Sequence, residues 1–254
     1  MPLALRLVQH DFWLFRRSWQ SSLASIIGPF FYLSAMGIGL GTLVDRQSGG
    51  VDGVSYIVFL APGLMAAAAM QSAVSNNAWP IMGKIRWNHT YYALLATPIG
   101  IDQLVAGEVI WAAVRLVQIN VCFLIAMVVF RAVPSWWGLL SIPAATLTGL
   151  AFATPMIAIS ALLRNDGGFT LVFRLVVTPL FLFGGAFFPI SRLPRLLQIV
   201  AWGTPLFHGV SLTRGLVLGN LSPGIGAINV AVLLAFTAAG LIAARWAFRR
   251  KLMQ

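Results

Sequence analysis

The sequence predicts an all-α, polytopic membrane protein that crosses the bilayer six times. Of its 254 residues, 59% are hydrophobic and only 9% are charged, whereas a soluble domain carries roughly 25% charged residues. Six apolar stretches are long enough to span, since roughly 20 helical residues cover the ~30 Å hydrocarbon core. Lipid must therefore solvate much of the surface, and residues 1–254 are expected to form a single membrane domain.

The predicted spans cover residues 22–44, 54–74, 104–130, 137–163, 168–188 and 225–248. Pro62 and Pro155 lie inside two of them, where each proline removes a backbone donor and bends the helix. Gly37 and Gly41 form a G-x-x-x-G pair in the first span. That spacing permits close contact between helices.

Lysine and arginine predict the orientation. With an even number of crossings both termini lie on one side of the membrane. That side receives ten basic residues: Arg6, Arg16, Arg17, Lys84, Arg86, Arg164, Arg245, Arg249, Arg250 and Lys251. The other side receives five: Arg46, Arg131, Arg192, Arg195 and Arg214. Because basic residues accumulate on the cytoplasmic side, we predict both termini in the cytoplasm. This pattern and anionic headgroups explain the net charge of +11, and no nucleic acid is expected as a partner.

Residues 1–20 are expected to form an amphipathic helix. One face carries apolar residues at helical spacing, namely Leu5, Val8, Phe12, Phe15 and Trp19. Arg6, Gln9, Arg16 and Arg17 occupy most of the remainder. The pattern is typical of a helix that lies in the membrane interface with its basic side toward headgroups. The alternative is a basic tail that only sets the topology.

The stretch 76–101 is too long for a turn between adjacent helices. Its central part, 91–98, is apolar and aromatic on the predicted cytoplasmic side. Such a surface needs a cover, which is either the membrane interface or a groove on a soluble partner. Asp102 precedes the third apolar run and is predicted as its N-cap.

The stretch 187–219 on the opposite side predicts two short helices in series. Pro194 suits a first helical position, and Gly203 ends that helix after too few residues to cross. Thr204 and Pro205 suit the cap and first position of the next helix. The pair predicts a re-entrant hairpin, which needs protein or a cavity around it. The alternative is a loop that lies flat in the interface.

Three charges fall inside predicted spans, where each is costly. Glu108 and Arg115 lie seven residues apart in the third span, too far for a direct pair at ~1.5 Å per residue. Glu108 is expected to meet Arg16, Arg17 or Arg174 as a structural clasp between helices. Arg115 and Arg174 are either structural or line a path for a charged headgroup.

Several chemical classes are not supported by any motif. Cys122 is the single cysteine, so no internal disulfide or thiolate metal cluster is expected. Gly83-Lys84 is followed by Ile85, which does not complete a phosphate-binding P-loop. We therefore predict a non-catalytic chain with no metal and no cofactor of its own.

Four stretches, taken in order, resemble the membrane subunits of ABC-2-type exporters. They are Tyr32-Leu33 with Gly37 to Gly41; Ser55 to Gly63; Leu94-Leu95-Ala96-Thr97-Pro98 with Gly107-Glu108; and Gly184 to Ile190 with Leu193-Pro194 and Pro205-Leu206. The chain looks most like the nodulation-factor (lipo-oligosaccharide) export permeases and the related daunorubicin-resistance permeases. Arg174 departs from the pattern, since the resemblance leads us to expect an uncharged residue there.

The resemblance implies a six-helix half-transporter in a bacterial cytoplasmic membrane. It would pair with a second permease half, identical or paralogous, and bind two copies of a separate ATPase that holds ATP and Mg²⁺. The coupling residues that it implies are Tyr91, Tyr92, Leu94, Leu95, Ala96, Thr97 and Pro98, with Arg16 and Arg17 of the interface helix. Phe187, Phe188, Pro189, Trp202 and Phe207, with Arg115 and Arg174, would line the path and the exit gate.

The expected cargo is an amphiphile, such as a lipid-linked glycan or a hydrophobic drug, because the exit region is apolar and aromatic. Two other classes stay open: an ATP-independent channel or secondary carrier, and a membrane-bound assembly factor. The chain shows no repeat at its middle and no ion-coupling carboxylates, which disfavours a carrier.

Overall fold

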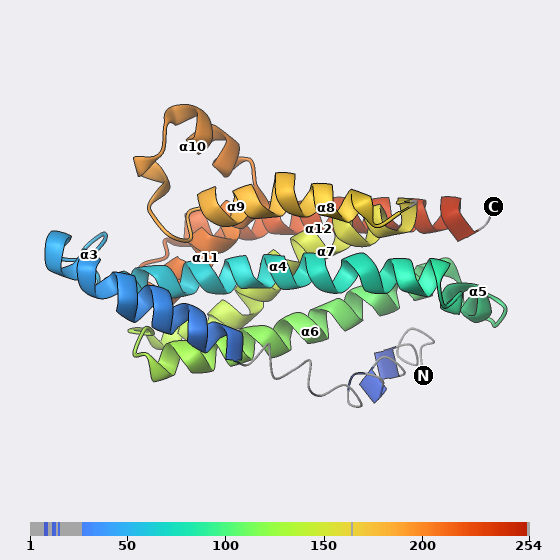
Figure 1. The fold of residues 1–254 in the computed structure, drawn as a ribbon, viewed down its shortest axis with the longest axis horizontal. Helices are drawn as coiled ribbons and strands as arrows, with labels where there is room; N and C mark the ends of the chain where they lie inside the picture. The colour runs from blue at the N-terminus through green and yellow to red at the C-terminus, as the bar shows by residue number, and fades with distance from the viewer. Residues whose placement is uncertain (1–7, 10–11, 14, 16–26, 164, 253–254) are drawn as a thin grey trace.

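The structure, a computed structural model, describes residues 8–9, 12–13, 15, 27–163 and 165–252. Across these residues every regular element is helical, and the long helices run side by side along one axis (Figure 1). The all-α class predicted from the sequence is confirmed. An isolated bridge between Val51 and Val54 is the one β-type pairing in this described part.

The elements follow one another with short connections. They are η1 (Leu33–Leu40), α3 (Gly41–Ser48), α4 (Tyr56–Arg86), α5 (Thr90–Leu95), α6 (Ile101–Val129), η2 (Trp136–Leu140), α7 (Ser141–Leu162), α8 (Gly167–Val172), η3 (Phe173–Val177), α9 (Thr178–Phe183), η4 (Ile190–Arg192), α10 (Arg195–Trp202), α11 (Pro205–Leu218) and α12 (Pro223–Leu252). We refer to the two ends of the bundle as the α5 end and the α10 end.

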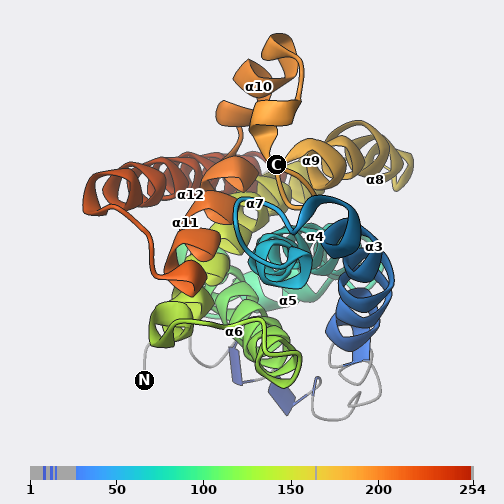
Figure 2. The ribbon, with the colours of Figure 1, turned by 90° about the vertical axis from the view of Figure 1, so that its left-hand side faces the viewer.

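Helices α4 and α7 form the centre of the bundle, and α4 is encircled by other elements in the end-on view (Figure 2). Helix α7 packs against α4, α6, α11 and α12. The α7–α12 crossing is close because Gly240 faces Thr154, where a Cβ would clash with the threonine Oγ1. Thr154 Oγ1 also donates to the Thr237 carbonyl of α12 at 3.1 Å. A small residue and an interhelical hydrogen bond are what close packing in lipid requires.

Five helices are long and apolar enough to cross a membrane: Ile27–Gln47, Tyr56–Arg86, Ile101–Val129, Trp136–Leu162 and Pro223–Leu252. They match five of the six predicted spans. The remaining predicted span, 168–188, corresponds to the apolar helix Gly167–Phe183, which is shorter than the other five. At ~1.5 Å per residue it is about 25 Å long, against a ~30 Å hydrocarbon core. The chain is thus a membrane protein with several spans.

The predicted end of the second span was wrong. Helix α4 does not stop near Val74 but continues to Arg86, so the connection to α6 is much shorter than 76–101. The polar residues that suggested an end are satisfied within the helix. Ser75 Oγ donates to the Gln71 carbonyl at 2.8 Å, and Asn77 Nδ2 donates to Ala73 at 2.7 Å. Such local bonds let short polar side chains stay inside a helix.

The two short helices predicted in 187–219 are present. Helix α10 begins after Pro194 and ends before Gly203, and α11 begins at Pro205 with Thr204 as its N-cap residue. Helix α10 projects away from the bundle (Figure 2), whereas α11 packs against α4, α7 and α12. Most of the predicted interface helix, 1–20, lies outside the described residues.

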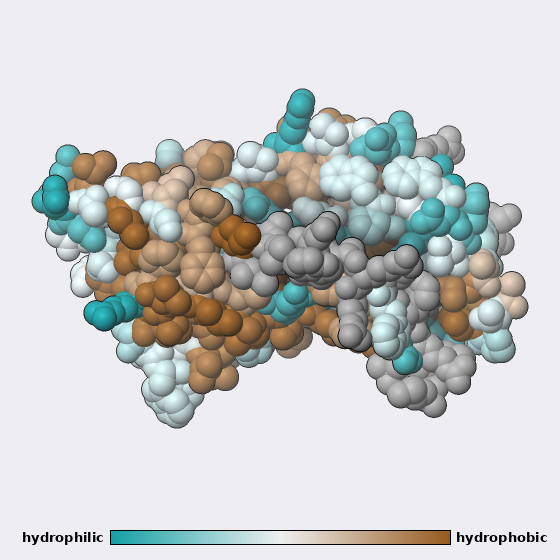
Figure 3. All heavy atoms as spheres, turned by 60° about the horizontal axis from the view of Figure 1, so that its bottom comes forward, coloured by the Kyte–Doolittle hydropathy of each residue, from teal (hydrophilic) through white to brown (hydrophobic). Residues whose placement is uncertain are grey.

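The surface is apolar along the bundle and more polar toward its ends (Figure 3). Brown, hydrophobic atoms cover much of the left and centre of this face, and teal atoms gather at the left tip and over the right-hand part. Large aliphatic side chains such as Ile125, Val129, Leu175 and Ile242 are exposed on the helices. This distribution is that of a protein whose sides face lipid.

Candidate coupling site and substrate pathway

Helix α5 is a six-residue helix that crosses the α5 end of the bundle. It follows a sharp turn in which His89 adopts a left-handed backbone conformation, with φ of 49°. Tyr91 is fully buried, and Leu94 and Leu95 are half-buried. The buried side of this short helix therefore faces the membrane helices, and its other side is exposed.

A buried tyrosine, glutamate and lysine connect α5 to two membrane helices. Tyr91 donates its hydroxyl hydrogen to Glu108 Oε1 of α6 at 2.7 Å, and Lys84 Nζ of α4 lies 2.7 Å from the same oxygen. The Glu108 side chain is only 3% exposed and that of Lys84 is 19% exposed. One carboxylate oxygen thus joins α4, α5 and α6. We call these residues the Tyr91–Glu108–Lys84 triad.

Glu108 connects helices as predicted, but its basic partner among the described residues is Lys84 and not Arg174. The sequence suggested Arg16, Arg17 or Arg174, but the structure places Lys84, an α4 residue assigned only to the charge bias, against the carboxylate. Lys84 was missed because the predicted second span ended too early, which left Lys84 outside any predicted helix. Arg16 and Arg17 lie outside the described residues.

An apolar cluster surrounds the triad and extends its reach to α7 and α12. The Tyr91 ring lies 5.5 Å from that of Phe248 in α12. The buried members of the cluster are Ile81, Ile85, Tyr91, Ile101, Leu104, Val105, Ile157, Ala158, Ala161, Ala244, Ala247 and Phe248, with Leu94 and Leu95 packed against them. A displacement of α5 would therefore act on four membrane helices at once.

The remaining predicted coupling residues form the outer side of this segment. Tyr92, Ala96, Thr97 and Pro98 are exposed. Thr97 Oγ1 donates to the Leu94 carbonyl at 2.6 Å, which fixes the turn after the helix. The segment thus offers a compact surface that is largely apolar.

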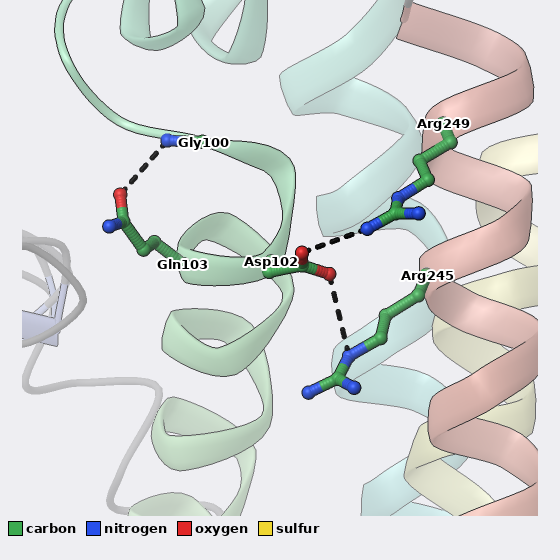
Figure 4. Close-up of polar contacts among 5 residues, drawn as sticks. All are labelled: Gly100, Asp102, Gln103, Arg245 and Arg249. Atoms are coloured by element: carbon green, nitrogen blue, oxygen red, sulfur yellow. Dashed lines mark hydrogen bonds and ion pairs between the residues drawn. The ribbon is translucent and has the colours of Figure 1, made fainter.

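Asp102 is not the N-cap that the sequence predicted. Gly100 precedes the helix, and its backbone N–H donates to Gln103 Oε1 at 2.9 Å. Asp102 instead points from the first turn of α6 toward α12, where Arg249 and Arg245 lie 2.9 and 3.6 Å away (Figure 4). All three side chains are about half exposed, so each pair contributes at most about 1 kcal/mol.

Arg115 lines a cavity between α4 and α6. The cavity has a volume of about 210 Å³ and is lined by Phe15, Ser72, Ala73, Asn76, Asn77, Pro80, Lys84, Glu108, Trp111, Ala112, Arg115 and Leu116. Arg115 donates to Asn76 Oδ1 at 3.2 Å, and its guanidinium carbon lies 4.5 Å from the centre of the Phe15 ring. Arg174, by contrast, is exposed on η3 and lines none of the described cavities.

A larger cavity of about 610 Å³ opens at the α10 end. It is lined by Asp52, Val54, Phe59, Pro134, Gly185, Ile190, Phe207, Val210, Ser211, Arg214, Gly215, Leu218, Asn220, Leu221, Ser222 and Ile225. Of the predicted gate residues, Phe207 lines this cavity. Trp202 is exposed on α10, and Phe187 packs against Phe181 with the ring centres 5.1 Å apart. Phe188 and Pro189 are half-buried beside Phe187. The predicted gate residues therefore do not form one cluster.

Arg214 connects several segments at the α10 end, whereas the sequence predicted only that it lies on the outer side of the membrane. Its guanidinium donates to the carbonyls of Phe59 at 3.1 Å, Gly185 at 2.9 Å and Ala186 at 3.2 Å. It also lies 3.8 Å from the centre of the Phe59 ring. Helix α11 is thereby fastened to α4 and to the turn that follows α9. The sequence signal for this role was a single arginine among the mostly apolar residues of a helix too short to cross the membrane.

The charge of Arg214 persists despite its surroundings. Desolvation lowers the pKa of the guanidinium to about 10, and the nearby Asp52 carboxylate opposes that shift. The side chain is therefore protonated at neutral pH, and its N–H groups donate to the three carbonyl oxygens. Gly63 of α4 leaves room for the contact, because a Cβ there would lie 2.8 Å from the Arg214 Nη2 and from the Ala186 Cα.

The sequence is similar to known transport proteins over most of its length. Residues 3–218 match the model of the ABC-2 type transporter family. The chain is 33% identical to Nodulation protein J of Rhizobium leguminosarum bv. viciae over 242 residues, 92% of this chain and 90% of that protein. It is 33% identical to Nodulation protein J of Bradyrhizobium diazoefficiens, over 92% and 88% of the two chains. It is 26% identical to the inner membrane transport permease YadH of Escherichia coli, over 81% and 78%. The chain belongs to the ABC-2 type transporter family.

Proposed function

We propose that the chain is the permease subunit of an exporter driven by ATP, which a separate ATPase subunit hydrolyses. The observation that carries this proposal is the two-sided α5 segment. Its exposed, largely apolar side suits a groove on a soluble partner. Its buried side holds Tyr91, which is bonded to Glu108 beside Lys84.

The proposed mechanism is a movement of α5 that is transmitted to the membrane helices. Closure of two ATPase subunits on nucleotide presses on α5 in each of two permease halves. Because Tyr91 packs among α4, α6 and α12, the push moves these helices together rather than bending one of them. The halves then shift as near-rigid bodies between an inward-open and an outward-open arrangement. ATP drives the change through its different affinity for the two states.

The proposed topology has six crossings with both termini in the cytoplasm. Gly167–Phe183 is the fifth crossing, and α10 with α11 is a re-entrant hairpin on the outer side. The placement of Lys84, Arg86, Arg249 and Lys251 at the α5 end supports this orientation, because basic residues mark the cytoplasmic side.

The proposed cargo is an amphiphile. The cavity of about 610 Å³ at the α10 end lies in the range of roughly 300–1,000 Å³ typical of small-molecule sites. It combines Phe59 and Phe207 with the polar Ser211, Asn220 and Arg214. Such a lining suits a molecule with an apolar body and a polar head. The resemblance to lipo-oligosaccharide export permeases, stated from the sequence, favours the same class.

Pro98→Asp tests the coupling role. Pro98 is exposed, so the substitution adds a charge to the proposed contact without disturbing the core, whereas Leu95→Asp would also disrupt the packing of the half-buried Leu95. We expect ATP turnover of the purified complex to fall at least about tenfold, since a charge buried in an apolar interface removes ~2 kcal/mol or more. The chain should still insert in the membrane.

The matched control is Asn165→Asp, which adds the same charge on an exposed residue of the α7–α8 connection at the same end. It should keep wild-type turnover. If Pro98→Asp retains both the ATPase and its turnover, the coupling assignment is wrong. If the tagged wild-type chain is purified from its native membrane without any ATPase, the exporter proposal fails, and a channel, carrier or assembly factor takes its place.

A further inference from the structure

The cavity between α4 and α6 holds a positive charge that has no acidic counterpart in the described part of the chain. Lys84 and Glu108, at one side of the cavity, form a pair with an N–O distance of 2.7 Å and so neutralise one another. Arg115 contacts an amide oxygen and an aromatic ring. The described lining therefore carries one net positive charge.

Arg115 cannot reach the aqueous phases along its own helix. It is the midpoint of α6, Ile101–Val129, with fourteen residues on either side. Those fourteen residues span about 21 Å at ~1.5 Å per residue. Arginine near a helix end can extend its head to the interface, but a central arginine is too far from it. The charge must be compensated where it lies.

The cavity is the right size for a headgroup and too small for a whole amphiphile. Its volume of about 210 Å³ equals that of about seven water molecules at ~30 Å³ each. A guanidinium forms paired hydrogen bonds with the oxygens of a phosphate group. Within the part of the chain that the structure describes, Arg115 donates one hydrogen bond, to Asn76, so other N–H groups remain for a ligand.

The apolar part of the lining indicates that the ligand has an apolar part too. The Phe15 ring lies over the guanidinium and meets the Trp111 ring edge-on, with the ring centres 5.8 Å apart. The aromatic pair offers contact to the apolar carbons next to the headgroup of a lipid, and the guanidinium offers hydrogen bonds to its anion. A free inorganic ion would use the cation alone.

We propose that this cavity binds the phosphate group of a lipid-type molecule, with Arg115 as the anchoring cation. The same chemistry is carried by an anionic phospholipid of the bilayer and by a phosphate-bearing amphiphilic cargo. The site goes beyond the proposed function, because it exists whether or not ATP drives transport.

The test is a binding titration of the full-length chain in a neutral detergent. The probes are dioleoyl phosphatidic acid and dioleoylglycerol, which differ only in the phosphate. We expect the wild-type chain to bind phosphatidic acid and not dioleoylglycerol. Arg115→Gln should weaken phosphatidic acid binding about tenfold or more, because the charge-assisted hydrogen bonds to the phosphate are lost. Arg131→Gln is the matched control, because Arg131 is exposed just beyond the end of the same helix, and it should bind like the wild type.

Asn76→Asp tests the same phosphate site if Arg115→Gln fails to fold. Asn76 Oδ1 already accepts a hydrogen bond from Arg115 at 3.2 Å, so an aspartate of the same shape supplies an internal counter-charge. This variant should fold as well as the wild type and lose phosphatidic acid binding. Unchanged binding in folded Arg115→Gln or Asn76→Asp, or equal binding of dioleoylglycerol, would overturn the proposal.

Competition with phosphatidylglycerol distinguishes the two sources of the phosphate, a bilayer phospholipid and a phosphate-bearing cargo. If phosphatidylglycerol displaces phosphatidic acid at equal concentration, a bilayer phospholipid is the occupant. If it does not displace it, the site requires a terminal phosphate, which favours a phosphate-terminated cargo over the common phosphodiester lipids. Either result supports a phosphate site.

Discussion

Glu108→Ala is expected to destabilise the chain by about 3 kcal/mol, toward the low end of the ~3–5 kcal/mol lost when one member of a buried ion pair is removed. The low end applies because Lys84 is 19% exposed and thus partly solvated. The Tyr91 hydroxyl loses the same acceptor. For a chain of this length the change corresponds to a melting temperature lower by roughly 10 °C in detergent.

Two variants separate charge from contact at this position. Glu108→Gln keeps a carbonyl oxygen for Tyr91 and should be less destabilised than Glu108→Ala. Combining Lys84→Met with Glu108→Leu removes both charges, and should restore much of the lost stability, as replacing both members of a buried pair usually does. If Glu108→Ala melts within 2 °C of the wild type, roughly 1 kcal/mol or less, the triad is not a structural connection.

Arg214→Met is expected to release the hairpin at the α10 end. The substitution preserves apolar bulk, but the carbonyls of Phe59, Gly185 and Ala186 lose their donor. Hydrogen bonds to a charged group contribute ~1.5–3 kcal/mol each, and the set is not additive, so we expect a loss of about 3–5 kcal/mol. Backbone amides of α10 and α11 should exchange hydrogen faster, whereas those of α12 near Arg249 should not.

Arg214→Lys is the matched control for that result. Lysine keeps the positive charge but lacks the planar fork that reaches several acceptors, so an intermediate loss is expected. Equal protection of α11 in Arg214→Met and in the wild type would show that packing alone holds the hairpin. A uniform increase in exchange across all helices would show that Arg214 stabilises the whole bundle instead.

The sequence predicted the elements whose signals are local. Apolar stretches gave five of the spans, and Pro194, Gly203 and Pro205 marked both ends of α10 and the start of α11 to within a residue. These signals depend on what each residue does to its own backbone. They do not require knowledge of any partner.

What the sequence did not predict depends on contacts between distant residues. The end of α4 was placed too early because Asn76 and Asn77 resemble a loop until their partners are known. Lys84 was not predicted as a partner of Glu108, because the longer α4 carries it there. Arg214 was assigned only to a surface, because its acceptors are backbone carbonyls of two other segments. A backbone carbonyl acceptor cannot be recognised from the residue type, because every residue carries one.

The short helix Gly167–Phe183 has a consequence for the surrounding bilayer. In the proposed topology it is the fifth crossing, and its apolar length of about 25 Å falls short of the ~30 Å hydrocarbon core, a case of hydrophobic mismatch. Leu171 and Leu175 are exposed on this helix, so lipid tails or another protein must cover them. A bilayer that meets it directly thins along this flank. Thinning shortens the apolar barrier for a polar headgroup, and membranes built from shorter acyl chains should therefore favour transport by this protein.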